Sequence, residues 1–171
     1  MADVEVCFNR AMGLTYGRLD LMLAESSLPS ELRTIAASGV AILGDRVYLR
    51  ESWPFRASTA EQMERWSAER WVNDTPLRIP PGSSHALWRA QLLGWGVVIA
   101  LSLLSDAGER RCPFDLQAIV SLQSAAGHAD AENPFELGAM NLYSVQEADD
   151  DLTTGIEQFA EPVATLTLRS G

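Results

Sequence analysis

One long apolar stretch constrains the fold more than any other feature of the sequence. The run LLGWGVVIALSLL holds 13 residues without a charge and lies in a helix predicted over about residues 85–105. A bilayer span needs roughly 20 apolar residues, and Arg89 and Gln91 interrupt any extension of this run. A helix that is apolar on nearly all sides must be covered by other elements. We therefore expect a central buried helix and no membrane span.

Alternating apolar residues indicate strands near both ends of the chain and around residue 45. Residues 3–8 alternate between polar and apolar side chains, and so does the segment VATLTL at 163–168. The segments VAIL and RVYL flank Gly44 and Asp45, which is the pattern of a hairpin with a two-residue turn and a positive φ at Gly44. We expect the first and last strands to pair and to hold both ends of the chain.

Shorter helices are predicted from periodicity and capping signals. Residues 16–25 carry a helical apolar pattern, and residues 27–38 hold a second short helix that a glycine ends. Overlapping capping boxes in the segment STAEQ begin a helix of about 14 residues that ends near Asn73. The prolines and the glycine within residues 75–83 exclude a regular element there.

Two similar segments can be interpreted in two ways. PFDLQAI and PFELGAM repeat the same residue types 21 positions apart. A proline followed by an acid favours short helices, whereas the alternation of apolar residues from Leu116 to Leu122 favours a strand. Segments 113–123 and 134–143 therefore remain either helices or strands at this stage. A further short helix is predicted near residues 153–160.

These elements predict an α+β fold in a single domain over residues 1–171. A small antiparallel sheet, made of the hairpin near 40–50 and the N- and C-terminal strands, packs on the long helix and on shorter helices. A chain of 171 residues with a hydrophobic fraction of 47% can bury a core of its own. Cys7 and Cys112 lie far apart and form no CxxC motif, which favours a reducing, cytoplasmic location.

The search for catalytic and cofactor motifs gives a negative result, so we expect no cofactor. No nucleophile elbow, zinc-protease helix, phosphate-binding loop or dinucleotide fingerprint is present. The one ligand-like cluster is His128-x-Asp130-x-Glu132, whose side chains would share one face of a strand. A transition-metal site usually has a second His or a Cys, so a solvated loop is the favoured interpretation and a metal site the alternative.

Charge favours a binding function with a basic protein partner. The net charge is −10 and all 13 basic residues are arginine, which disfavours direct binding of nucleic acid. The candidate docking residues are an acidic run and two aromatic residues after the hairpin: Glu147, Asp149, Asp150, Asp151, Trp53 and Phe55. Clustered carboxylates attract a basic surface over about 8–10 Å, and tryptophan is common among binding hot spots.

The leading hypothesis is an intracellular inhibitor of the immunity or antitoxin type, which occludes a basic bacterial toxin such as a nuclease. It requires the carboxylates around residue 150 to face outward rather than to pair with arginines of the same chain. The first alternative is a secretion chaperone or adaptor that acts as a homodimer with an apolar groove. The second is a small enzyme that uses the metal cluster or the thiol of Cys112, which Arg110 and Arg111 would activate if it were exposed.

Overall fold

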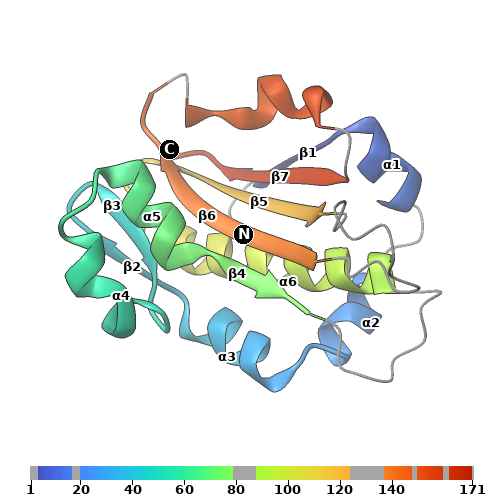
Figure 1. The fold of residues 1–171 in the computed structure, drawn as a ribbon, viewed down its shortest axis with the longest axis horizontal. Coiled ribbons are helices and arrows are strands. Elements are labelled where there is room, and N and C mark those ends of the chain that lie inside the picture. Colours follow the sequence, from blue (N-terminus) through green and yellow to red (C-terminus); the bar gives the residue numbers. More distant parts are fainter. Residues whose placement is uncertain are drawn as a thin grey trace, which may run out of the picture.

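Helix α6 (Trp88–Glu109) forms the centre of the structure, as the apolar run predicts (Figure 1). The computed structural model describes residues 4–16, 20–78, 88–123, 137–147, 150–159 and 162–170. Among these residues, α6 is the one helix long and apolar enough to cross a membrane. In the fold, 61% of its apolar window is buried, and side chains such as Ile99 and Leu103 are fully covered. The helix thus supplies the core that the sequence predicts.

A five-stranded antiparallel sheet packs against α6. Its order is β1-β7-β5-β6-β4. The strands are β1 (Val4–Phe8), β4 (Thr75–Leu77), β5 (Asp115–Gln123), β6 (Leu137–Val145) and β7 (Val163–Leu168). The first and last strands pair as predicted, with Val4 opposite Leu168. Both segments left open by the sequence are strands, β5 and β6, in the middle of the sheet.

The contact between β5 and α6 follows from strand alternation and one glycine. Leu116, Ala118 and Val120 are fully buried on one face of β5. A Cβ added to Gly96 of α6 would lie 2.4 Å from Cγ1 of Val120. The helix therefore approaches the strand more closely than a side chain at this position would allow.

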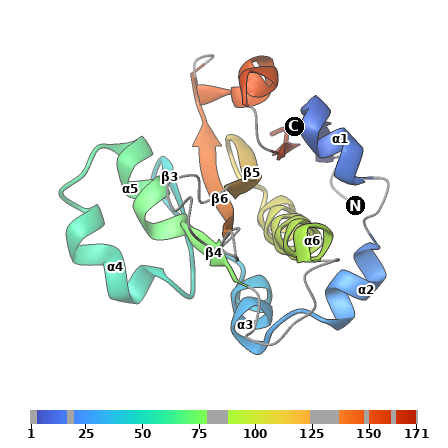
Figure 2. The ribbon, with the colours of Figure 1, turned by 45° about the vertical axis from the view of Figure 1, so that its right-hand side comes forward.

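Shorter elements cover the remaining surfaces of α6 and the sheet. Helices α1 (Arg10–Tyr16), α2 (Leu21–Ser26) and α3 (Ser30–Ser38) surround α6 on the side away from β6 (Figure 2). The 3₁₀ helix η3 (Leu152–Gln158) packs on β7 and β1. The helix predicted over 16–25 is thus shorter, and α1 before it was not predicted.

Gly39 ends α3 in a conformation that only glycine adopts readily. Its φ is +71°, and a Cβ there would lie 2.3 Å from Oδ2 of Asp106. That oxygen accepts a hydrogen bond from the Val40 N–H at 2.9 Å and pairs with Arg110 at 2.8 Å. Asp106 of α6 therefore holds the start of the following strand.

The predicted hairpin is confirmed, but it does not join the main sheet. Strands β2 (Val40–Leu43) and β3 (Arg46–Leu49) form a separate two-stranded sheet, with φ of +65° at Gly44. Helices α4 (Trp53–Ala60) and α5 (Arg65–Asn73) lie beside β3 (Figure 1). The expectation that the hairpin belongs to the same sheet as the terminal strands is therefore wrong, because α5 contributes the side chains that link β3 to β6.

Two further expectations for this region are corrected. The single helix predicted to end near Asn73 is two helices, because a first helix begins at Trp53 and residues 61–64 form a turn. The segment 75–83 was expected to hold no regular element, but its first three residues form β4. Pro76 is tolerated there because β4 is an edge strand, where a missing N–H costs no pairing.

Candidate functional site

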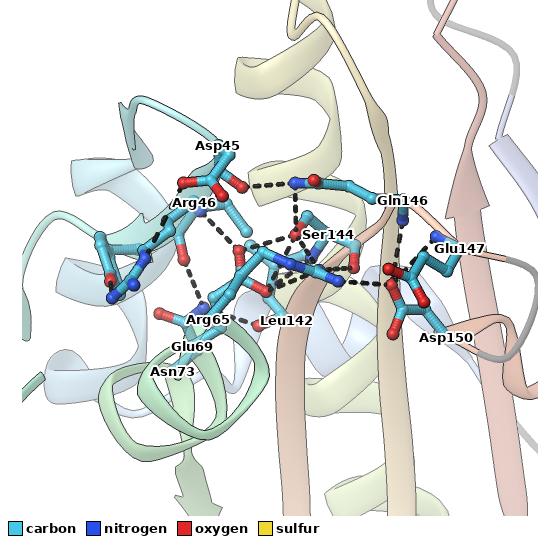
Figure 3. Close-up of polar contacts among 12 residues, drawn as sticks. Asp45, Arg46, Arg65, Glu69, Asn73, Leu142, Ser144, Gln146, Glu147 and Asp150 are labelled. Atoms are coloured by element: carbon cyan, nitrogen blue, oxygen red, sulfur yellow. Dashed lines mark hydrogen bonds and ion pairs between the residues drawn. The ribbon is translucent and has the colours of Figure 1, made fainter. Parts of the chain in front are cut away.

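Helix α5 carries a buried polar stripe that faces two strand edges. Arg65, Glu69 and Asn73 are spaced four residues apart, so they lie on one face of the helix. Glu69 and Asn73 have no exposed surface, which is unusual for a glutamate. Figure 3 shows this stripe between β3 and β6.

The Glu69 carboxylate accepts hydrogen bonds from both strands. One oxygen accepts the Val47 N–H of β3 at 2.8 Å, and the other accepts the Ser144 N–H of β6 at 3.0 Å. The Ser144 hydroxyl lies within 3.0 Å of both oxygens, and Arg65 pairs with the carboxylate at 3.9 Å. Burial raises the pKa of Glu69, and these hydrogen bonds and Arg65 oppose that rise.

Asn73 makes the complementary connection. Its amide nitrogen donates to the Val47 carbonyl at 2.9 Å and to the Leu142 carbonyl at 2.6 Å. Its amide oxygen accepts the Leu49 N–H at 2.8 Å. The N–H groups of Val47 and Ser144 thus both donate to Glu69, and the carbonyls of Val47 and Leu142 both accept from Asn73. Strands β3 and β6 belong to different sheets, so these side chains satisfy backbone groups that the strands do not pair with each other. We call Glu69 and Asn73 the adapters between the two strands.

Arg65 extends the stripe to the predicted acidic run. Its guanidinium donates to Oδ2 of Asp150 at 2.7 Å and to the Ser144 carbonyl at 3.0 Å. The same Asp150 oxygen accepts the N–H groups of Gln146 and Glu147. Partial burial alone would raise the pKa of Asp150, but the hydrogen bonds from Arg65 and the backbone outweigh it and lower the pKa.

Asp151 is also bound within the chain. It pairs with Arg169 at 3.2 Å and accepts hydrogen bonds from the Gln117 amide and the Thr153 N–H, both at 2.9 Å. Burial acts to raise its pKa, but the hydrogen bonds from Thr153, Gln117 and Arg169 lower it to about 2. Arg169 also pairs with Asp115 at 3.0 Å, so this cluster holds β5, β7 and the start of η3 together.

The predicted acidic docking run therefore does not present a set of free carboxylates. Asp150 and Asp151 face arginines of the same chain, whereas Glu147 is exposed. Asp149 lies outside the described residues. The arginines offset the local negative potential, so Asp150 and Asp151 no longer support the charge-steering mechanism expected at this place.

Three of the exposed aromatic side chains belong to α4 and α5, and two others, Phe8 and Phe159, lie elsewhere in the described structure. Phe55 is 84% exposed, Trp71 50% and Trp66 42%. The guanidinium of Arg56 lies 5.4 Å from the ring centroid of Trp71, and that of Arg70 lies 5.2 Å from Trp66. Such contacts hold the rings in fixed positions and leave part of each ring available.

Trp53 and Phe55, the two predicted aromatic contacts, have different environments. Trp53 stacks on Tyr48 with ring centroids 4.3 Å apart and packs against a small apolar cluster, so it contributes to the fold. Phe55 projects into solvent. The sequence analysis did not select Trp66 and Trp71 as candidate contacts. The spacing of Trp66 and Arg70, four residues apart, is the signal for an exposed cation–π pair.

Two carboxylates accompany the exposed rings. Glu61 follows α4 and Glu64 precedes α5, and both are exposed. Neither forms an ion pair with another residue in the described part of the chain. Glu64 and Trp66 both belong to the first turn of α5 and its cap, so this end of the helix carries an exposed carboxylate and an exposed ring.

The remaining candidate residues form no catalytic or metal site within the described part of the chain. His128, Asp130 and Glu132 lie outside the described residues, and those that are described hold no cluster of three metal-ligating side chains. Cys112 is buried, and burial raises the pKa of its thiol. This is the opposite of the activation that Arg110 and Arg111 would give an exposed thiol.

Comparison with known proteins adds no functional information. No family model, curated protein or solved structure matches this chain.

Proposed function

We propose that the chain is a protein-binding module whose basic partner docks on α4 and α5. The docking surface consists of Phe55, Glu61, Glu64, Trp66 and Trp71. The observation that carries the proposal is the exposure of three large aromatic rings on these two short, adjacent helices. Large aromatic side chains that lie open to solvent are enriched at protein–protein interfaces.

Covering these rings would supply part of the free energy of binding. Covering the exposed part of each ring contributes roughly 1–2 kcal/mol. Trp66 and Trp71 are already restrained by arginines, so a partner loses less side-chain entropy when it orders them. Tryptophan and arginine are the residue types most enriched among interface hot spots.

Charge supports a basic partner. The net charge is −10, and many arginines donate to oxygens of the same chain: Arg33, Arg46, Arg50, Arg56, Arg65, Arg110 and Arg169. These arginines are engaged within the chain, and the net charge of −10 is what a basic partner would meet. Glu61 and Glu64 add two exposed carboxylates at the ends of α4 and α5, where a partner arginine could pair with an acid.

Inhibition of a basic toxin in the cytoplasm remains a more specific form of this proposal. It no longer rests on Asp150 and Asp151, because both carboxylates are paired within the chain. An inhibitor would instead cover the partner's active site with α4 and α5. The affinity would come from Trp66 and Trp71, and the rate of association from the overall negative charge.

The test is quantitative capture of partners from a lysate of the source organism, with three forms of the purified chain. The wild type is compared with the double variant Trp66→Ala, Trp71→Ala and with the matched control Met22→Ala, Leu23→Ala. Met22 and Leu23 are 83% and 61% exposed on α2, away from the docking surface. The captured protein is then identified, purified and titrated against each form.

We expect a basic protein that binds the wild type and the α2 control alike. The tryptophan double variant should bind at least about 30-fold more weakly, which corresponds to one hot spot of 2 kcal/mol. Association should slow as salt rises from 50 to 500 mM, because charge contributes to encounter. Equal affinity of all three forms, or a partner of acidic composition, would refute the proposal.

A further inference from the structure

The apolar core of the described structure is divided into two unequal clusters. The large one contains 27 buried residues around α6 and the five-stranded sheet. The small one contains Tyr48, Ala60, Ala68 and Val72, with Trp53 and Met63 packed against it. This small cluster lies between β3 and the α4–α5 pair. Because apolar burial is the main source of cohesion, separating α4 and α5 from the rest costs far less than opening the large core.

The two helices are joined directly to each other at both ends. The Arg56 guanidinium of α4 donates to the carbonyl of Trp71 at the end of α5, and the four-residue turn closes the opposite end. Contact with β6 runs through the polar side chains of Arg65, Glu69 and Asn73. The pair is therefore a compact unit whose polar contacts with β6 are made by these three side chains of α5.

We propose that α4 and α5 separate from the strands as one unit while α6 and the five-stranded sheet stay folded. In this proposal, the hydrogen bonds of Glu69 to Val47 and Ser144 stabilise the closed form. This inference rests on the proposed function for its biological meaning, because the same unit carries the docking surface. A partner that touched both this unit and the adjoining strands would favour the closed form, and Glu69 would then set how much of the chain is ready to bind.

Three strand amides report on the opening directly. The N–H groups of Val47, Leu49 and Ser144 donate to Glu69 or Asn73, so each loses its acceptor when α5 leaves. Amides in the middle of α6, such as those of Ile99 and Leu103, lose theirs when the core unfolds. Hydrogen exchange followed by NMR on the full chain therefore separates the two events, without any partner.

The wild-type chain should exchange Val47, Leu49 and Ser144 with a common opening constant, at least about tenfold larger than that of the α6 amides. Glu69→Gln places an amide NH₂ against a backbone N–H and should raise that constant at least another tenfold. The α6 amides should not change by the same factor. Glu25→Gln, at an exposed position of α2, is the matched control and should leave all five amides as in the wild type.

Two results would overturn the inference. One is exchange of Val47 and Ser144 in the wild type as slow as that of Ile99 and Leu103. The other is an equal acceleration of strand and α6 amides in Glu69→Gln. The wild-type measurement decides the question even if the variant does not fold. Since no partner is used, failure here is distinct from failure of the docking proposal, which the affinity of the tryptophan variant decides.

Discussion

The substitution Asn73→Asp tests the adapter role of α5 most sharply, because it changes hydrogen bonding without changing size. Aspartate can still accept the Leu49 N–H, but it removes the nitrogen that donates to the carbonyls of Val47 and Leu142. An ionised carboxylate would face two carbonyl oxygens at a position with no exposed surface. The introduced carboxyl is therefore expected to take up a proton in the folded state.

The expected loss of stability is the free energy of keeping this carboxyl protonated in the folded state, plus the cost of one carbonyl left without a donor. Holding a proton on a carboxyl of ordinary pKa, about 3.9, costs about 4 kcal/mol at pH 7 and about 1.5 kcal/mol at pH 5. A protonated carboxyl donates to one carbonyl only, and the second unpaired carbonyl adds about 1 kcal/mol. The variant should thus be about 5 kcal/mol less stable than the wild type at pH 7, and about 2.5 kcal/mol less stable at pH 5.

The sign of the pH dependence distinguishes this mechanism from a simple packing defect. The folded-state pKa of the introduced aspartate is raised above its unfolded value, so the variant regains stability as pH falls toward the ordinary carboxyl pKa. Asn73→Ala loses all three hydrogen bonds and introduces no titrating group, so its difference from the wild type should not change between pH 5 and 7.

The assay is urea denaturation of the wild type and both variants at pH 7 and pH 5. Each variant is compared with the wild type at the same pH, which removes the contribution of the other titrating groups. The reasoning is refuted if Asn73→Asp costs less than about 1 kcal/mol at pH 7, or if its cost is the same at both pH values.

Three further predictions concern positions outside the adapter. Gly39→Ala should destabilise the fold by about 2–4 kcal/mol in denaturant titrations, because the new Cβ meets Asp106; Gly44→Ala has a similar φ but open space, and should cost only about 1 kcal/mol. Equal costs would contradict this explanation. Asp151→Asn should cost about 1–2 kcal/mol at pH 6, because the pKa of Asp151 in the fold is about 2. Since that pKa is depressed, the contribution is present above pH 4 and disappears toward pH 2; a difference that persists at pH 2 would exclude the Arg169 pairing as its source. Cys112→Ala should leave partner binding unchanged in titration, since the thiol is buried; loss of binding by a folded variant would contradict that.

The parts of the fold that were predictable are those in which a local pattern agrees with the final environment. The apolar run of α6, the turn at Gly44 and the alternation in β1 and β7 indicate the observed elements because packing reinforces each local preference. The segments at 113–123 and 134–143 could not be decided, since strand pairing between distant parts of the chain determines them.

The candidate site was less predictable than the fold. Helix α5 buries Glu69 and Asn73 and exposes Trp66 and Trp71, which reverses the usual rule of apolar inside and polar outside. The pairing of Asp150 with Arg65, 85 positions away in the sequence, has no local signal either. Both features depend on which strand edges meet α5, and that is a property of the tertiary arrangement.

Glu69 and Asn73 occupy backbone hydrogen-bonding groups on the facing edges of β3 and β6. This has a consequence for association between molecules. An open strand edge is the commonest starting point for unwanted sheet extension and fibril growth. Here the backbone groups of Val47, Leu142 and Ser144 are already occupied by side chains of α5. A foreign strand could be added at this place only after the helix had been expelled, so the same contacts that position α5 also guard the molecule against self-templated aggregation.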